Sequence, residues 1–178
     1  MDRERFEKQL NFILEIDKEK QILRQTHIRG YSRQEDDAEH AWHMAVMAFL
    51  LQEYSNEKID IGRTMLMLLI HDLVEIDAGD TYAYDAEANK TKDEREHKAA
   101  ERIYGLLPED QGKMLMDLWL EFEAYETPEG RFAHVMDNFQ PLLLNHENDG
   151  KDWTRHNVRI SQPLKRNEKT TTGSEEIW

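Results

Sequence analysis

Apolar residues recur with a helical period along almost the whole chain. Near the N-terminus, Phe6, Leu10, Ile13 and Leu14 fall on one stripe, which predicts an amphipathic helix running to about Leu23. No stretch alternates between apolar and polar residues, as a half-buried strand would. The pattern therefore predicts an all-α protein, a compact bundle with crossing helices.

Residues suited to cap helices divide the first half of the chain. Asp36 or Asp37 can cap a second helix, whose apolar residues include Trp42, and we expect that tryptophan in the core. Asp60 can cap a third helix, which is apolar nearly all round over residues 65–70. A helix of that kind usually lies at the centre of a bundle.

The second half predicts further helices over residues 93–104 and 108–123. Thr127 followed by Pro128 is typical of another helix start, and Pro141 is expected to kink or end that helix. Beyond about residue 150 the pattern weakens, and we expect residues 169–176 to be poorly ordered. A length of 178 residues is consistent with a single domain over residues 1–178.

The composition narrows the possible functions. Lys and Arg total 23 against 37 for Asp and Glu, and the resulting net charge of −14 argues against a nucleic-acid duplex as partner. The chain has no cysteine, so any metal must be held by His, Asp and Glu. The first residues lack the apolar region of a signal peptide, and no apolar run approaches the roughly 18 residues that span a bilayer. We therefore expect a cytoplasmic protein with no membrane partner.

A polar doublet, His71 and Asp72, ends the apolar run of the third helix. A buried carboxylate needs a cation or several hydrogen bonds, and a divalent metal ion supplies that cation. His40 on the second helix and Asp137, which lies between apolar residues of a later helix, are candidate partners. A single helical His is more often a hydrogen-bonded structural residue, but four such residues on three helices indicate a metal site.

The order of these residues resembles the HD-domain metal-dependent phosphohydrolases, whose pattern is His, then His-Asp, then a distant Asp. The similarity is closest to the bacterial 5′-deoxynucleotidase branch and its relatives, and it covers residues 6–148. It implies an HD-domain helical bundle that binds one divalent ion, which could be Mn, Co, Ni, Fe, Zn or Mg. The implied ligands are His40, His71, Asp72 and Asp137.

The resemblance also assigns roles to three residues outside the ligand set. Glu75 takes part in acid/base chemistry near the attacking water, and Asp80 orients that water or protonates the leaving 5′-oxygen. Read without the family, Glu75 could be a surface acid and Asp80 a turn residue. Arg24 matches the arginine of an Arg-Trp pair used on the nucleotide and could bind phosphate, or it could be an exposed solubilising residue. Gln25 stands where the tryptophan is expected, so deoxyribose selectivity does not follow.

The implied function is hydrolysis of a nucleoside 5′-monophosphate, or of a similar small phosphate ester, by a metal-activated water. One alternative is a binuclear HD phosphodiesterase or oxygenase, in which His97 and His134 add ligands for a second metal. Another is a non-catalytic nucleotide-binding HD module. The family further implies a homodimer. Glu39, next to His40, is a candidate to hydrogen-bond that histidine without binding the metal itself.

Overall fold

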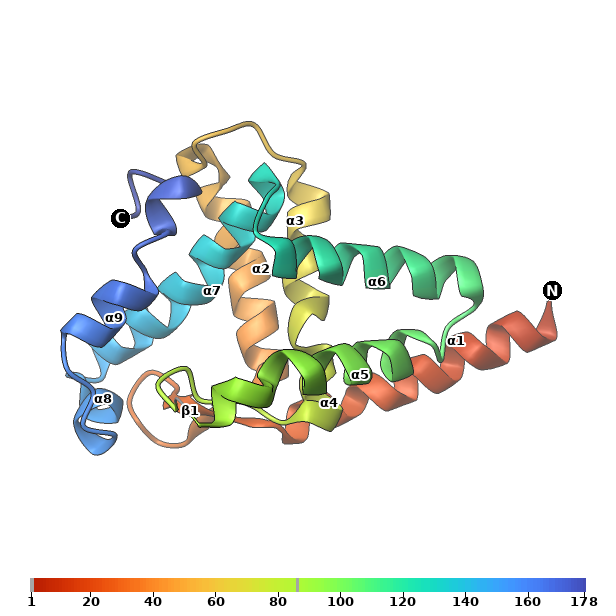
Figure 1. Ribbon diagram of the computed structural model, residues 1–178, viewed down its shortest axis with the longest axis horizontal. Helices are drawn as coiled ribbons and strands as arrows, with labels where there is room; N and C mark the ends of the chain where they lie inside the picture. Colours follow the sequence, from red (N-terminus) through yellow and green to blue (C-terminus); the bar gives the residue numbers. More distant parts are fainter. Residues whose placement is uncertain (1, 86) are drawn as a thin grey trace.

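Helices account for nearly all of the regular structure in the computed structural model, which describes residues 2–85 and 87–178 (Figure 1). None of the described helices combines the length and hydropathy that crossing a bilayer requires. The predominance of helices confirms the predicted all-α fold. The helices are α1 (Arg3–Ile16), α2 (Asp37–Leu51), α3 (Ile61–Ile70), α4 (Glu75–Ala78), α5 (Lys92–Tyr104), α6 (Glu109–Ala124), α7 (Pro128–Glu147), α8 (Lys151–Arg155) and α9 (Ser161–Arg166).

A short hairpin interrupts the helical chain where the first helix was predicted to continue. After α1 the chain forms a 3₁₀ turn (Asp17–Gln21), then strand β1 (Leu23–His27) and strand β2 (Gln34–Asp36), which pair antiparallel with an irregular register. Gln25 and its neighbours in β1 are all partly exposed, so the strand shows no alternation of buried and exposed residues. The hydrophobic pattern could not reveal it for that reason.

Helix α3 lies at the centre of the bundle and contacts α2, α6 and α7. Its Met67 and Leu68 are completely buried, which agrees with the prediction of a central helix. Leu66 and Leu69 on the same helix are exposed. The helix is apolar all round, but only one of its faces fills the core and another lies at the surface.

The apolar stripes of α1 and α2 face solvent. On α1 Phe12 is buried in the core and Ile16 packs against it, while the stripe predicted from the sequence is exposed. Trp42 on α2 is 64% exposed, so its predicted place in the core is wrong. Periodicity identifies the apolar face of a helix but does not say what covers it. The exposed apolar residues of these two helices are Phe6, Leu10, Ile13, Leu14, Trp42, Val46, Phe49 and Leu50.

Most predicted helix starts are confirmed by hydrogen bonds at the caps. Asp36 caps α2 in a reciprocal arrangement with Glu39, Asp60 caps α3, and Thr127 caps α7 ahead of Pro128. Helix α7 does not end at Pro141 but continues to Glu147. The proline lacks an amide hydrogen, so α7 gives up one backbone hydrogen bond at this position.

The C-terminal residues dock against the bundle, contrary to the disorder expected for residues 169–176. Asn56 donates to the carbonyl of Thr171 at 2.7 Å and of Gly173 at 3.0 Å, and it accepts from the amide of Glu175 at 2.8 Å. Ser174 is completely buried. Polar contacts with a loop far away in the sequence hold this segment in place. Such contacts cannot be predicted from the local sequence pattern.

Candidate active site

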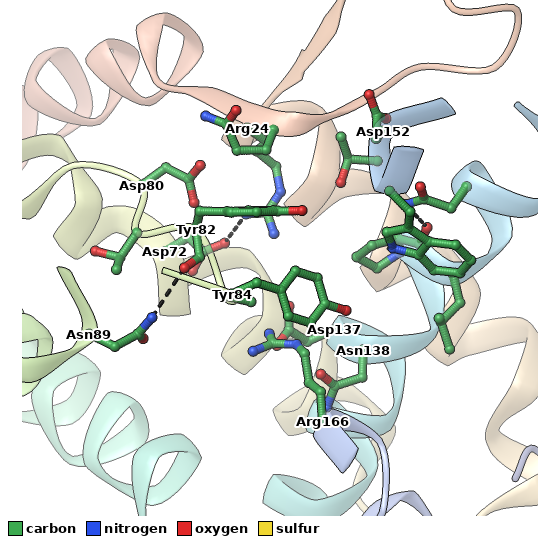
Figure 2. A pocket seen from close by; sticks show the side chains of 18 of the residues that line it. Arg24, Asp72, Asp80, Tyr82, Tyr84, Asn89, Asp137, Asn138, Asp152 and Arg166 are labelled. Atoms are coloured by element: carbon green, nitrogen blue, oxygen red, sulfur yellow. Dashed lines mark hydrogen bonds and ion pairs between the residues drawn. The ribbon is translucent and has the colours of Figure 1, made fainter. Parts of the chain in front are cut away.

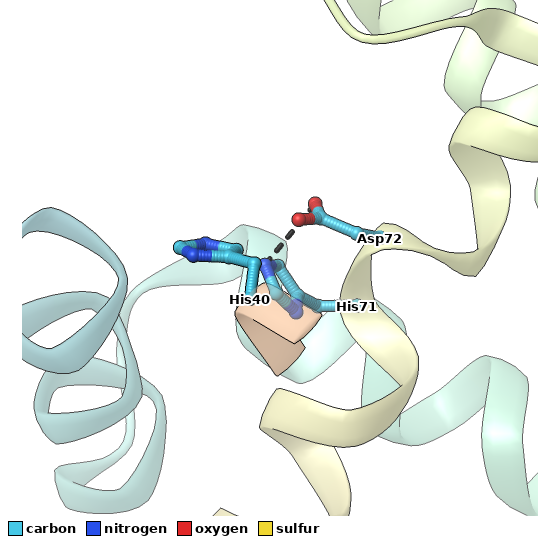
Figure 3. Close-up of side chains that lie close together, drawn as sticks. All are labelled: His40, His71 and Asp72. Carbon is cyan, nitrogen blue, oxygen red and sulfur yellow. Dashed lines mark ion pairs between the residues drawn. The ribbon is translucent and has the colours of Figure 1, made fainter. Parts of the chain in front are cut away.

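The four predicted metal ligands converge from separate parts of the fold. His40 comes from α2, His71 and Asp72 from a 3₁₀ turn (His71–Val74) after α3, and Asp137 from α7. Ligand atoms of the first three lie within 4.8 Å of one another (Figure 3). Asp137 Oδ1 lies 3.2 Å from His40 Nε2 and 4.0 Å from His71 Nε2.

The local backbone explains how His71 and Asp72 turn toward the site together. After Ile70 the helix tightens into the 3₁₀ turn, which changes the direction of the following side chains. His71 Nδ1 donates to the carbonyl of Leu68 at 2.9 Å, and this leaves Nε2 facing Asp72 Oδ1 at 3.1 Å. The doublet thus presents one imidazole nitrogen and one carboxylate to the same point.

The donor set fits a divalent cation. His71 Nε2 is buried without a hydrogen-bond partner among the described residues, as expected of an atom that binds an ion. Burial would lower the pKa of His71, but the carboxylates of Asp72 and Asp137 raise it to about 9. Burial and the charge of Arg24 lower the pKa of His40 to about 4. The site therefore attracts positive charge and keeps one imidazole neutral, which is the form that binds metals.

A second layer of polar residues holds His40 in place. His40 Nδ1 donates to Gln140 Oε1 at 3.0 Å, and Gln140 Nε2 donates to Glu35 Oε1 at 2.6 Å. Glu39, the residue expected in this role, instead accepts from Arg33 at 2.7 Å. Gln140 was missed from the sequence, although it lies one helical turn beyond Asp137 and so shares its face of α7.

A cavity opens above the ligands, and the predicted catalytic residues line it (Figure 2). Glu75 lies at the start of α4, and Asp80 follows Gly79, whose φ of 74° lets the chain leave the helix and enter the cavity wall. Neither acid is at the open surface, so the alternative of an exposed acid for Glu75 is wrong.

Burial gives these acids unusual proton affinities. It raises the pKa of Glu75 well above its ordinary value, and the negative charges of Asp72 and Asp37 add to this effect. Burial and the charge of Asp72 also raise the pKa of Asp37 to about 7, although the charge of Arg24 opposes this. The pKa of Asp80 is raised by burial as well. These carboxyl groups therefore hold a proton more readily than exposed acids do, which makes them candidates to supply one.

Arg24 extends from β1 into the wall of the cavity and is only 13% exposed, so it is not a solubilising surface residue. Its Nη1 donates to Asp72 at 2.9 Å and to Asp37 at 3.2 Å. Gln25 lines the same cavity. The hairpin that the sequence pattern missed is thus the element that brings Arg24 to the metal ligands.

The two histidines considered for a second metal point elsewhere. His134 Nε2 hydrogen-bonds the carbonyl of Phe122 at 2.9 Å, and its ring stacks on the Phe122 ring at 3.9 Å. The His97 ring packs against Trp119 at 5.7 Å. Within the part of the chain that the structure describes, neither joins the His40, His71 and Asp72 cluster.

Residues of the weakly patterned C-terminal segment complete the cavity. Asp152 lines it from α8 and accepts two hydrogen bonds from His27 of β1, at 2.7 Å from Nδ1 and 2.9 Å from the amide. Trp153 and Arg166 line it too, and so do Tyr82 and Tyr84 from the loop after Gly79. Their positions depend on tertiary packing, so the sequence offered no signal for them.

Comparison with known proteins agrees with this geometry. A family model described as HD domain matches residues 16–178. The human protein 5'-deoxynucleotidase HDDC2 is 32% identical over 115 residues, which are 65% of this chain and 55% of that protein. Its Danio rerio counterpart is 32% identical over 67% of this chain and 58% of its own length. The chain thus spans little more than half the length of these relatives.

Solved structures share the fold closely. A protein from Magnetospirillum magnetotacticum MS-1, described as a predicted metal-dependent phosphohydrolase, superposes with a TM-score of 0.93 at 50% identity, over 97% of this chain and 87% of that one. A Pyrococcus furiosus protein superposes with a TM-score of 0.62 at 24% identity, over 88% of this chain and 94% of that one, and supports the fold alone.

Proposed function

Because this chain belongs to the HD-domain family, we propose that it is a metal-dependent phosphohydrolase acting on a nucleoside 5′-monophosphate or a similar small phosphate ester. The observation that carries the proposal is the convergence of His40, His71, Asp72 and Asp137 under a cavity lined by further acids. Catalytic sites for phosphate esters combine a metal with groups that transfer protons.

These four residues would hold one divalent ion, chosen from Mn, Co, Ni, Fe, Zn or Mg. When bound, the ion would polarise a phosphoryl oxygen and lower the pKa of a water molecule. Two carboxylates offset the charge of a dication, so an anionic phosphate can approach it without a large net charge in the cavity.

Glu75 and Asp80 would transfer the protons of the reaction. Water attacks phosphorus, the bond from phosphorus to the ester oxygen breaks, and the water proton passes to one carboxylate. The leaving alcohol oxygen takes a proton from the other carboxyl group. The raised pKa values of both acids support this exchange, because burial makes each carboxyl group a better proton acceptor than an exposed one. Arg24 would orient Asp72 through Nη1 and bind substrate through the rest of its guanidinium.

A nucleoside on the phosphate is supported by the aromatic residues of the cavity. Tyr82, Tyr84 and Trp153 line the same space as the acids, and flat aromatic rings bind a nucleobase by stacking. The names of the curated relatives agree with a nucleotide substrate. Because Gln25 stands where a tryptophan is expected, selectivity for deoxyribose is not part of the proposal.

The chain would act as a single domain over residues 1–178 and as a homodimer. The exposed apolar stripes of α1 and α2, together with Leu66 and Leu69 of α3, support a second copy as partner, since exposed apolar patches mark interaction surfaces. A location in the cytoplasm stays a prediction from the sequence.

The test is a phosphate-release screen over ribo- and deoxyribonucleotides with protein loaded with Mn, Co, Ni or Mg. We expect turnover of at least one nucleoside monophosphate and one bound ion per chain by elemental analysis. The Asp72→Ala variant should lose both. Asp77→Ala is the matched control, because Asp77 lies five residues further on and pairs with Arg102 outside the cavity. An Asp72→Ala protein that kept its metal and its activity would overturn the proposal.

The same screen decides between the alternatives. Two tightly bound ions per chain would favour a binuclear enzyme. Nucleotide binding without turnover under every metal would favour a non-catalytic module.

A further inference from the structure

The cavity contains a cation that the proposed reaction has not yet used, Arg166 at the end of α9. Arg166 belongs to the segment beyond residue 150, for which the sequence pattern predicted neither a helix nor a functional site. Figure 2 shows its side chain reaching from α9 toward Asp137 and Tyr84, on the side of the cavity opposite Asp80. Its position raises the question of what anion it would bind.

Two protein carboxylates already offset the charge of the other arginine of the cavity, which leaves the rest of its guanidinium as a weaker site for an anion. Arg24 donates to two carboxylates, Asp72 and Asp37, at 2.9 and 3.2 Å. Glu75 and Asp80 add further carboxyl groups nearby. Because a phosphate ester brings its own negative charge into this acidic space, it needs a cation that is not held in a closed pair.

Arg166 has donors to spare. Its Nη2 lies 3.9 Å from Asp137 Oδ2, beyond hydrogen-bond distance, and the side chain is 42% exposed. Among the described residues its guanidinium donates no hydrogen bond. Asp137 meanwhile turns Oδ1 toward His40. One oxygen of Asp137 therefore faces His40 and the other faces the guanidinium of Arg166. A phosphate bound beside Asp137 would lie within reach of this guanidinium.

Lys92 is the other lysine or arginine that lines the cavity within the described residues, and it is less suitable. Its Nζ lies 3.5 Å from Glu96 Oε1, a buried acid of its own helix, whereas Arg166 lies 3.9 Å from Asp137. An ammonium also acts as a point charge, whereas a guanidinium can bind two phosphate oxygens in one plane.

We propose that Arg166 binds the phosphate group of the substrate, and that the C-terminal segment is for this reason part of the active site. The inference rests on the proposed function, since it names the residue that recognises the phosphate. A phosphomonoester has three terminal oxygens, so two can face the guanidinium while the third would face an ion held by the proposed ligands. A phosphodiester lacks one of these oxygens, so Arg166 also favours monoesters.

The experiment compares Arg166→Ala and Arg166→Lys with Lys165→Ala. Lys165 is the neighbouring residue on α9, and it does not line the cavity. For each manganese-loaded protein, calorimetry gives the Kd of inorganic phosphate, steady-state assays give KM and kcat for a nucleoside monophosphate, and elemental analysis gives bound manganese. Arg166→Ala should raise the phosphate Kd and KM about tenfold or more, as expected for one lost charge-assisted contact, with manganese content unchanged. Arg166→Lys should recover part of the affinity, and Lys165→Ala should match the parent protein.

Two outcomes would overturn the inference. One is unchanged phosphate affinity in Arg166→Ala while the parent protein hydrolyses the ester, which leaves the proposed function standing. The other is loss of manganese from Arg166→Ala, which would make Arg166 a positioning residue for Asp137. If the parent protein binds phosphate through Arg166 but hydrolyses no ester, the proposed function fails and the phosphate site stands.

Discussion

His40 and Gln140 are joined by a hydrogen bond of 3.0 Å from His40 Nδ1 to Gln140 Oε1. Gln140 is held in turn by Glu35, and both side chains are buried. The bond fixes which imidazole nitrogen carries the proton and directs Nε2 toward Asp137. The nitrogen of His40 that would bind the ion therefore depends on a residue that would not itself touch the ion.

Replacing Gln140 with Leu should weaken metal binding while the ligands stay intact. His40 loses its acceptor and Glu35 loses its donor, so the imidazole can rotate away from Asp137. We expect the Kd for Mn²⁺ to rise about 10–100-fold, the range found when partners of metal-binding histidines are removed. Competition with a metal-sensitive dye measures it.

Gln111→Leu is the control for this change, since it removes a similar hydrogen bond, to Gln9, between α6 and α1 and away from the cavity. The role assigned to Gln140 would be wrong if both variants bound Mn²⁺ like the parent protein.

Replacing Glu75 with Gln, or Asp80 with Asn, should lower kcat by about 100-fold or more, since each change removes one proton-transfer group. Both variants should keep their bound metal, because neither residue belongs to the ligand cluster. Asp77→Asn, on the outer side of α4, should retain full activity. Near-parent kcat in both cavity variants would show that the protons travel by another route.

Glu19 should make the metal-free protein less stable as pH rises. It is 7% exposed, and its Oε1 lacks a hydrogen-bond partner among the described residues. Burial, with the nearby charges of Asp72 and Asp37, raises its pKa to about 8. The unfolded chain releases this proton near pH 4.5, so the folded state loses stability between pH 4.5 and 8.

Glu19→Gln isolates this effect, because the amide does not titrate. Between pH 5 and pH 8 the free energy of unfolding of the parent protein should fall by roughly 2–4 kcal/mol more than that of the variant. Urea denaturation in the presence of a chelator measures both proteins. Parallel pH dependence of the two would contradict the prediction.

Gly173→Ala should loosen the docking of the C-terminal segment. A methyl group there would lie 2.7 Å from the carbonyl oxygen of Arg131 and from Cγ2 of Val135, closer than atoms pack. We expect a loss of about 1–3 kcal/mol in the free energy of unfolding, measured by thermal and urea denaturation.

Gly62→Ala in α3 is the control for that substitution, because its methyl group would meet only Asp60 Oδ1 at 3.4 Å. Alanine favours a helix, so this variant should be neutral or up to about 1 kcal/mol more stable. Equal stability of the two variants would mean that residue 173 is not closely packed.

The sequence predicted those features that depend on local patterns. Helical periodicity and capping residues such as Asp60 and Thr127 located most helices, because a cap acts within one turn. The His71-Asp72 doublet pointed to a metal site because burying a carboxylate needs a compensating charge. The structure brings the four predicted ligands together from three parts of the chain.

Features that depend on tertiary packing were beyond sequence reasoning. The apolar stripe of α1 could be identified in the sequence, but the sequence did not show that this stripe faces solvent. Gln140 and Arg166 look like ordinary polar residues until α7 and α9 are placed beside the cavity. His134 has the spacing of a ligand relative to Asp137, yet its ring turns to the carbonyl of Phe122. The spacing of two residues shows that they share a helix face, but it does not determine the direction in which each side chain points.

Gly79 divides the two proposed proton-transfer residues between different kinds of structure. Glu75 is carried by a helix next to the turn of the predicted metal ligands, whereas Asp80 begins the loop that also carries Tyr82 and Tyr84. Gly79 has a left-handed backbone with open space around it, and Arg95 of α5 holds the start of the loop through Thr81. Replacing this loop alone should therefore change which ester the proposed enzyme prefers, while the helices that would hold the ion stay the same.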